Sequence, residues 1–117
     1  MIASDNRFHG QNGLKYVYRK GRTVRTKFAQ AKFTVNKFRT EYRASVVISK
    51  KVAKSAVVRN RIRRRIYEQV RIQAPHYLKN HDVVITIYDA SLAVCESAVI
   101  EDLIKKILVN IKTMSQH

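Results

Sequence analysis

The sequence predicts an α+β fold, an α/β two-layer sandwich in which helices pack on a mixed central sheet. Residues 55–74 and 97–114 repeat apolar side chains at helical spacing. Residues 26–37 alternate apolar and polar side chains, as half-buried strands do. Residues 82–88 are rich in β-branched side chains without alternation, which is typical of a strand buried on both faces.

The remaining elements complete the order helix, strand, strand, an optional third strand, helix, strand, helix. A short helix is predicted over residues 13–20, and Gly21 is expected to end it. A polar and basic turn near residues 36–41 leads to a second strand at residues 42–49.

The helix at residues 55–74 has an apolar side chain at every fourth position, which gives a continuous stripe toward the sheet. Pro75 is expected to end this helix. The last helix also buries one face. The two stripes comprise Val58, Ile62, Ile66 and Val70 in the first helix, and Ile100, Leu103, Ile104, Ile107, Leu108 and Ile111 in the second.

A basic ridge is predicted on the side of the long helix that lies opposite its apolar stripe, at 100° per residue. Arginine suits phosphate because its planar guanidinium can bond two oxygens at once. Tyr67 falls among these arginines, where it can either stack on a base or cover exposed helix. The ridge comprises Asn60, Arg64, Tyr67 and Arg71, with Arg61 and Arg63 beside them.

Charge indicates the class of partner. The chain has 24 lysines and arginines against 8 acidic residues, a formal net charge of +16. Residues 1–67 hold 19 of the basic and 2 of the acidic side chains. A segregated excess indicates a positive face directed at phosphate, so nucleic acid is the predicted partner. An anionic membrane is disfavoured because the basic segments lack bulky apolar residues.

Length and composition predict one domain over residues 1–117, without repeats or low-complexity segments. No apolar run is long enough to span a bilayer, and the first ten residues lack the apolar core of a signal peptide. The lone Cys95 fits a reducing compartment. We therefore expect a cytoplasmic protein.

No catalytic or metal-binding site is predicted in the chain itself. A protein nuclease needs carboxylates or histidines that gather metal ions or exchange protons. Residues 1–67 supply only Asp5, Glu41 and His9. The later candidates lack metal-ligand spacing and are interpreted as surface loop residues: His76, His81, Asp82 and Asp89.

One stretch resembles a known family. Residues 48–68 contain Ser49-Lys50-Lys51, followed eight residues later by Arg59-Asn60-Arg61. This combination is similar to the signature of the bacterial ribonuclease P protein family. Asn6-Arg7-Phe8, the helix before Gly21, the strand from Asp82 and the last helix resemble the family in order and position, so the resemblance covers nearly the whole chain.

The resemblance implies an α/β sandwich whose long basic helix lies in a left-handed βαβ crossover. It also implies that one set of residues contacts a catalytic RNA. The family usually has a basic residue where Tyr67 stands and an apolar one where Arg65 stands. The RNA-binding residues that the resemblance implies are Lys50, Lys51, Arg59, Asn60, Arg61, Arg63 and Arg64. Lys54 and Tyr67, which lie among these cations, are added to the expected RNA-binding set.

A cleft between the first helix and the sheet is implied to hold the single-stranded 5′ leader of precursor tRNA. Leu14 and Tyr18 occupy the positions of two family aromatics, and Lys32 faces them from the strand. Leader binding is therefore expected to rely more on charge than on stacking. The expected contacts are Leu14, Tyr18, Gln30 and Lys32.

The resemblance thus implies the protein subunit of a ribonucleoprotein endoribonuclease for tRNA 5′ maturation. Catalysis would belong to the RNA and to Mg²⁺ held mainly by the RNA, with no cofactor bound by the protein alone. The alternative is a ribosomal or other structural RNA-binding protein, which would share the size and charge. DNA is disfavoured as a partner because no helix-turn-helix or zinc-ligand spacing is present.

Overall fold

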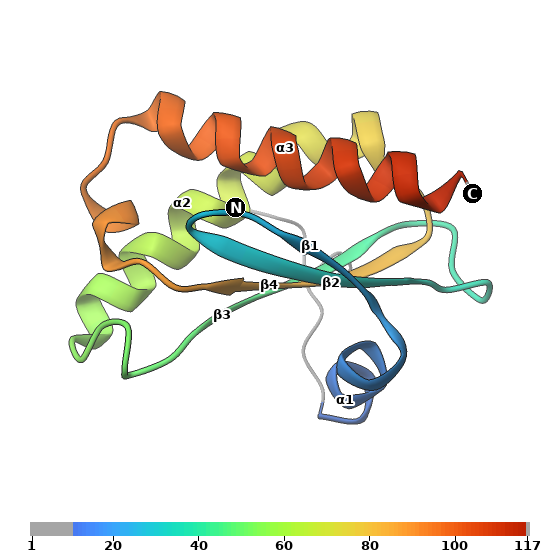
Figure 1. Ribbon diagram of the computed structural model, residues 1–117, viewed down its shortest axis with the longest axis horizontal. Helices are drawn as coiled ribbons and strands as arrows, with labels where there is room; N and C mark the ends of the chain where they lie inside the picture. The colour runs from blue at the N-terminus through green and yellow to red at the C-terminus, as the bar shows by residue number, and fades with distance from the viewer. Residues whose placement is uncertain (1–10, 117) are drawn as a thin grey trace.

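The computed structural model describes residues 11–116, and the predicted order of elements is confirmed (Figure 1). Three strands precede the long helix, and the additional one, β1, comes before the two strands whose residues were predicted. The elements are α1 (Gln11–Lys20), β1 (Arg22–Arg25), β2 (Ala29–Val35), β3 (Arg43–Ile48), α2 (Ala56–Tyr77), β4 (His81–Ile87), the short 3₁₀ helix η2 (Ala90–Ala93) and α3 (Ser97–Ser115).

The mixed sheet has four strands in the order β1-β2-β4-β3. β1 pairs antiparallel with β2, and β2 pairs antiparallel with β4. β3 and β4 are parallel, and α2 connects them, so the basic helix lies within a βαβ unit, as the resemblance implied. β3 is an edge strand.

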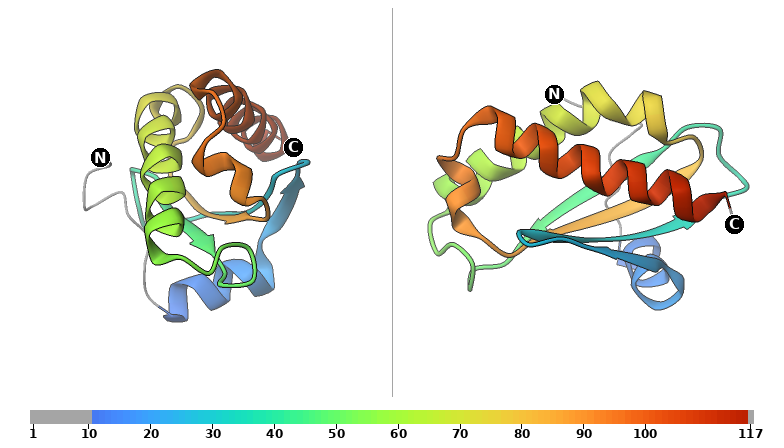
Figure 2. Two further views of the ribbon diagram at one scale, coloured as in Figure 1. Left: turned by 90° about the vertical axis from the view of Figure 1, so that its left-hand side faces the viewer. Right: turned by 45° about the horizontal axis from the view of Figure 1, so that its top comes forward.

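The sheet separates the helices into two layers. α2 and α3 cover one face, while α1 lies against the opposite face (Figure 2). The main core fills the space between the sheet and α2 and α3, and includes Phe33, Ile85 and Ile66. The whole predicted apolar face of α3 is buried, which confirms that stripe.

Several predicted boundaries differ from the structure, and two of the differences have a clear physical cause. The strand predicted over residues 26–37 begins only at Ala29, because the Thr26 hydroxyl donates to the Ala29 carbonyl and accepts from the Ala29 N–H, closing a turn. α2 does not end at Pro75 but continues to Tyr77, and the Leu78 N–H donates to the Ala74 carbonyl at 2.7 Å. A proline in the last turn removes only one intrahelical hydrogen bond, which is why the helix tolerates it.

Gly21 sets the position of α1 on the sheet. Its N–H donates to the Val17 carbonyl at 2.7 Å, at the end of the helix. A Cβ at this position would collide with that carbonyl oxygen and would crowd the Phe33 backbone of β2. Only glycine allows this close approach, so Gly21 determines how the chain turns from α1 into β1.

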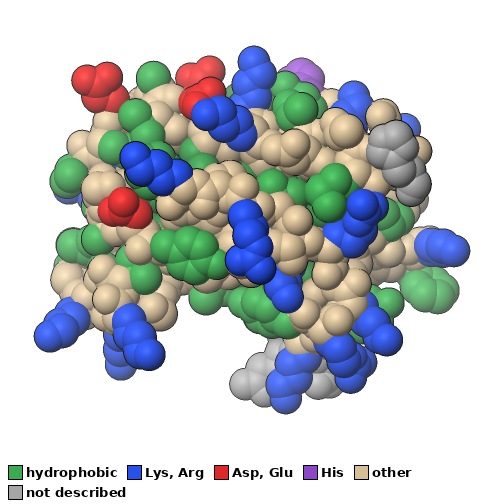
Figure 3. All heavy atoms as spheres, in the orientation of Figure 1, with side chains coloured by type: hydrophobic (Ala, Val, Ile, Leu, Met, Phe, Trp, Pro, Cys, Tyr) green, Lys and Arg blue, Asp and Glu red, His purple; other side chains and the backbone are tan. Residues whose placement is uncertain are grey.

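Charge is also segregated on the folded surface. In the view of Figure 3, basic side chains gather along the lower side, where Figure 1 places α1 and the loop between β3 and α2. Acidic side chains gather on the upper side, near α3. Among the helices of residues 11–116, none has the length and apolar character needed to cross a bilayer.

Candidate nucleic-acid interface

The basic side chains of the predicted ridge of α2 face away from the core. Ile62, Ile66 and Val70 are buried against the sheet and α3. Arg61, which precedes Ile62, and Arg64, which lies between Ile62 and Ile66, are exposed. The helical period therefore places apolar packing and cationic surface on opposite sides of one element.

Asn60 and Arg63 form a pair on the surface of this ridge. Arg63 Nη1 donates to Asn60 Oδ1 at 2.8 Å, across one helical turn. Asn60 is exposed and Arg63 is half-buried. This hydrogen bond uses the Asn60 amide oxygen, so the Asn60 amide nitrogen can still donate to a phosphate or a hydroxyl group. The other N–H groups of the Arg63 guanidinium can donate in the same way.

The prediction that Tyr67 belongs to the RNA-binding surface was wrong. Its side chain is only 6% exposed, and its hydroxyl accepts a hydrogen bond from the Val46 N–H at 3.1 Å. Since β3 is an edge strand, an N–H that does not point to β4 needs another partner. Tyr67 provides that partner, which the helical period alone could not show.

The loop before α2 presents the remaining cations. Lys50, Lys51 and Lys54 are all exposed. Arg59 has a structural role that the sequence did not show, because its Nη1 donates to the carbonyls of Ala53 and Lys54 at 2.7 and 2.9 Å. It is half-buried and fastens the lysine-bearing loop to the first turn of α2.

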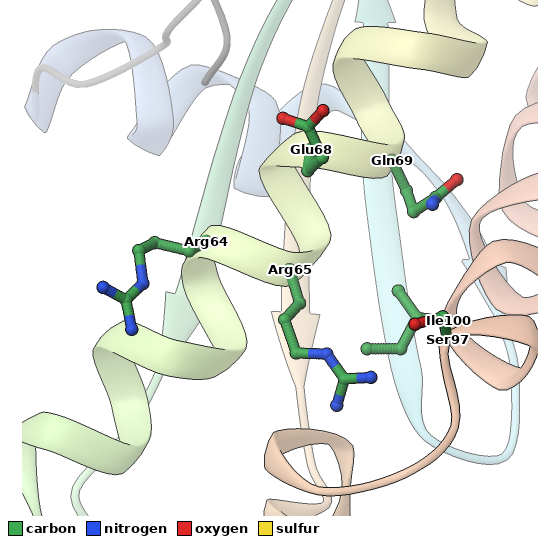
Figure 4. A pocket seen from close by; sticks show the side chains of 6 residues that line it. All are labelled: Arg64, Arg65, Glu68, Gln69, Ser97 and Ile100. Carbon is green, nitrogen blue, oxygen red and sulfur yellow. The ribbon is translucent and has the colours of Figure 1, made fainter.

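Arg65 links α2 to the segment before α3. Its two terminal nitrogens donate to the carbonyls of Leu92 and Cys95 at 2.7 and 2.5 Å. Figure 4 shows Arg65 pointing toward Ser97, whereas its neighbour Arg64 points away from α3. Both residues line an open groove of about 400 Å³ between α2 and α3, together with Glu68, Gln69, Ser97 and Ile100.

Arg71 is largely neutralised by a neighbour on its own helix. Arg71 Nη2 and Glu68 Oε1 are 2.5 Å apart, and both side chains are about half exposed. The Arg71 guanidinium is the main reason that the pKa of Glu68 falls to about 2. The ridge therefore carries its unbalanced positive charge on its N-terminal half.

The predicted cleft corresponds to the sheet face that α1 covers. Val17 is fully buried against Val84, and Leu14 and Val47 pack around them. Leu14 is thus a packing residue. α1 is held on the sheet by this apolar contact.

Polar residues continue this face beyond the apolar contact. Lys32 Nζ donates to the Tyr18 carbonyl at 3.1 Å, which ties β2 to α1. The Tyr18 side chain is 40% exposed. Lys32 therefore lies beside the C-terminal half of α1, and the role of Leu14, Tyr18 and Lys32 in leader binding stays a prediction.

Gln30 lies farther along β2 with two residues that the sequence analysis missed. Its Oε1 accepts hydrogen bonds from Arg25 Nη1 at 3.0 Å and from the Tyr88 hydroxyl at 2.9 Å. Arg25 pairs with Gln30 across the β1–β2 hairpin. Tyr88 follows β4 directly, two residues after Thr86, which pairs with Gln30. Because side chains two residues apart point to the same face of a sheet, the strand pairing places Tyr88 on the face of Gln30.

His81 and Asp82 are not the surface loop residues that the sequence suggested. Both are buried at the start of β4. Asp82 accepts from Arg43 through both carboxylate oxygens, at 2.9 and 2.8 Å, and from Asn36 at 3.0 Å. His81 Nδ1 accepts from the Lys79 N–H at 3.0 Å. The contacts of Asp82 join the start of β4 to the start of β3 and the end of β2, so this residue has a structural role.

Metal-ligating side chains do not cluster in the part of the chain that the structure describes. Residues 11–116 contain no group of three or more His, Cys, Asp or Glu side chains that could hold an ion. The β3–α2 loop and the first half of α2 instead present a cationic surface, comprising Lys50, Lys51, Lys54, Asn60, Arg61, Arg63 and Arg64.

Comparisons of the sequence with known proteins give one consistent result. A family model described as Ribonuclease P matches residues 2–112. The chain is also similar to the ribonuclease P protein component of Prochlorococcus marinus (strain MIT 9303), with 41% identity over 66 residues. This alignment covers 54% of the chain and 51% of the relative, so the chain spans about half the length of the curated relative it matches.

Solved structures show the same fold. The RNase P protein of Staphylococcus aureus superimposes with a TM-score of 0.77 at 23% identity, covering 91% of this chain and 94% of that one. The RNase P protein of Thermotoga maritima gives a TM-score of 0.79 at 16% identity, covering 89% and 96%. At such low identities the likeness establishes the fold alone.

Proposed function

Because the chain belongs to the ribonuclease P protein family, we propose that it is the protein subunit of the ribonucleoprotein endoribonuclease that removes the 5′ leader from precursor tRNA. The observation that carries the proposal is the cationic surface on and before α2, which is fastened to a rigid core. Such a surface fits the phosphates of a folded RNA.

In this proposal the RNA subunit carries the chemistry. Mg²⁺ prefers hard oxygen ligands, and RNA phosphates supply them in abundance, so we assign the ion mainly to the RNA. The protein reduces phosphate repulsion and positions the substrate. It acts through binding energy and not through a side chain that exchanges protons or attacks phosphorus.

The proposed contacts with the catalytic RNA come from two adjoining segments. The exposed lysines of the β3–α2 loop would bind the RNA phosphates as compact positive charges. The arginines of α2 would bind them through planar guanidinium groups that can donate two hydrogen bonds at once. Arg59 acts indirectly because it holds the loop. The direct contacts are Lys50, Lys51, Lys54, Asn60, Arg61, Arg63 and Arg64.

The proposed leader contacts lie on the α1 face of the sheet. Tyr18 offers an exposed ring, and Lys32 and Gln30 offer polar groups along β2. Arg25 and Tyr88 extend this polar surface beyond Gln30. Since precursor tRNA is made in the bacterial cytoplasm, we also propose that location.

Reconstitution tests the proposal. The purified chain is combined with a bacterial ribonuclease P RNA, and cleavage of precursor tRNA is measured at low Mg²⁺. We expect the chain to raise the cleavage rate, and Arg61→Ala with Arg64→Ala to reduce its RNA affinity. No stimulation, together with co-purification of ribosomal RNA, would favour the structural RNA-binding alternative.

A further inference from the structure

Asn36 makes several hydrogen bonds at the start of the loop between β2 and β3. The Asn36 N–H donates to the Asn80 carbonyl at 2.7 Å, and Asn80 Nδ2 donates back to the Asn36 carbonyl at 3.1 Å. Asn36 Oδ1 accepts from the Phe38 N–H at 3.0 Å, and its amide nitrogen donates to the buried Asp82. Three of these hydrogen bonds join the start of the loop to Asn80 and Asp82 at the beginning of β4, and the fourth lies within the loop.

This rigid start presents a fully exposed aromatic ring. Phe38 is 99% exposed, compared with 78% for Val94 and 76% for Val57, the next large apolar side chains among the described residues. The phenylalanine side chain cannot form hydrogen bonds with water, so removing its apolar ring from water against a partner is favourable. A rigid support lowers the entropy that binding would cost.

The residues around Phe38 indicate the chemistry of that partner. Lys37 and Arg39 flank the ring in sequence, and Glu41 is the acidic residue of the same loop. Arg39 Nε donates to the Glu41 carbonyl at 3.3 Å, so this arginine follows the loop backbone. An aromatic ring between cations is the combination that binds an unpaired nucleotide, with the ring on the base and cations near the phosphates.

The loop lies far from the cationic surface already described. α2 has 22 residues, which corresponds to a length of about 33 Å. Figure 1 shows the β2–β3 loop at one end of the molecule and the β3–α2 loop at the other. In Figure 3, hydrophobic and basic side chains project together at the β2–β3 end. A single RNA that contacts both ends must therefore extend over about 33 Å.

We propose that Phe38 stacks on an unpaired base of the catalytic RNA, forming a second contact at the end of the protein opposite the N-terminus of α2. The catalytic RNA is the favoured source because it remains bound through each cycle, and so keeps the ring covered, whereas precursor tRNA leaves after cleavage. The inference rests on the proposed function.

A single tryptophan reports the contact directly. The chain contains no tryptophan, so Phe38→Trp introduces one fluorophore at the proposed site. Titration with a bacterial ribonuclease P RNA should quench its emission and protect it from acrylamide. Adding precursor tRNA to the assembled holoenzyme should change the emission no further. Quenching that requires precursor tRNA, or that rises with protein concentration without RNA, would overturn the assignment.

Affinity measurements separate stacking from charge. Phe38→Ala should weaken binding of the ribonuclease P RNA about fivefold to a hundredfold, as expected for loss of one stacked base. Phe38→Leu should lose nearly as much, whereas Phe38→Tyr should retain most of the affinity. The slope of log affinity against log salt should stay unchanged for all three, because no phosphate contact is lost. Val94→Ala is the matched control and should bind as the wild type does.

The outcomes distinguish this inference from the proposed function. If Arg64→Ala weakens RNA binding while Phe38→Ala leaves it unchanged, the stacking contact is wrong and the function stands. If neither substitution matters, the proposed function fails as well. Because Phe38 is almost fully exposed, its variants should unfold at the wild-type temperature, and circular dichroism verifies this.

Discussion

The hydroxyl of Tyr67 accepts a hydrogen bond from the Val46 N–H at 3.1 Å, so a residue of the basic helix completes the edge of the sheet. Tyr67→Phe should therefore reduce the free energy of unfolding by about 1–3 kcal/mol, since a buried N–H loses its partner. RNA affinity should remain at the wild-type value. Urea unfolding and RNA titration of the same variant measure both quantities. A loss of RNA affinity at wild-type stability would restore the stacking interpretation.

Substitutions on the buried side of α2 should reduce stability, whereas substitutions on its exposed side should reduce RNA affinity. Ile62→Ala or Ile66→Ala should cost about 2–5 kcal/mol of stability, because each removes fully buried methyl groups. Arg61→Ala or Arg64→Ala should leave stability near the wild-type value and weaken binding of the catalytic RNA by about 1–3 kcal/mol. Chemical denaturation and filter binding measure the two effects. Equal stability losses in both classes would contradict the orientation of the helix.

Substitutions of the adjacent residues Arg64 and Arg65 should also differ in their effect on stability. Arg65 donates to two carbonyls of the segment before α3, whereas Arg64 is exposed. Arg65→Ala should reduce the free energy of unfolding by about 1–3 kcal/mol, with Arg64→Ala as its matched control. Hydrogen exchange should increase at residues 92–97 in the first variant only. Unchanged exchange there would show that the two hydrogen bonds do not hold the segment.

Stability should depend on pH through His81. Burial lowers the pKa of this imidazole from its ordinary value of 6.5, although nearby Asp82 opposes the shift. The unfolded chain then binds the proton more readily, so stability is complete above about pH 6.5 and is lost as the pH falls toward the folded-state pKa. Protonation would also remove the acceptor for the Lys79 N–H.

His81→Gln should reduce this pH dependence, whereas His76→Gln, at an exposed position, should keep the wild-type profile. Unfolding free energies measured between pH 5 and pH 8 check the difference. Identical profiles for the wild type and His81→Gln would show that another group controls the effect.

The leader contacts predict a difference between two tRNA forms. Tyr18→Ala removes an exposed ring but leaves its carbonyl, and hence the hydrogen bond from Lys32, in place. This variant should bind precursor tRNA more weakly and mature tRNA as the wild type does, since only the precursor carries a leader. Tyr16→Ala, on the same helix and 52% exposed, is the control. Equal losses for both tRNA forms would refute the leader assignment.

Local patterns in the sequence determined the fold class, the order of elements and the two apolar helix faces. The period of α2 separated Ile62 and Ile66 from Arg61 and Arg64, because side-chain direction in a helix follows from spacing alone. The excess of basic residues in the first 67 positions likewise indicated phosphate as the partner.

Only the tertiary structure decided the roles of side chains that lie between the apolar and the basic face of α2, and of polar side chains on the sheet. Tyr67 and Arg65 have ordinary helical spacing, yet one reaches the edge of β3 and the other the carbonyls of Leu92 and Cys95. Arg25 and Tyr88 join Gln30 only after strands distant in sequence have paired. Such contacts depend on which backbone groups lie within reach after the chain has packed, and no period in the sequence encodes that distance.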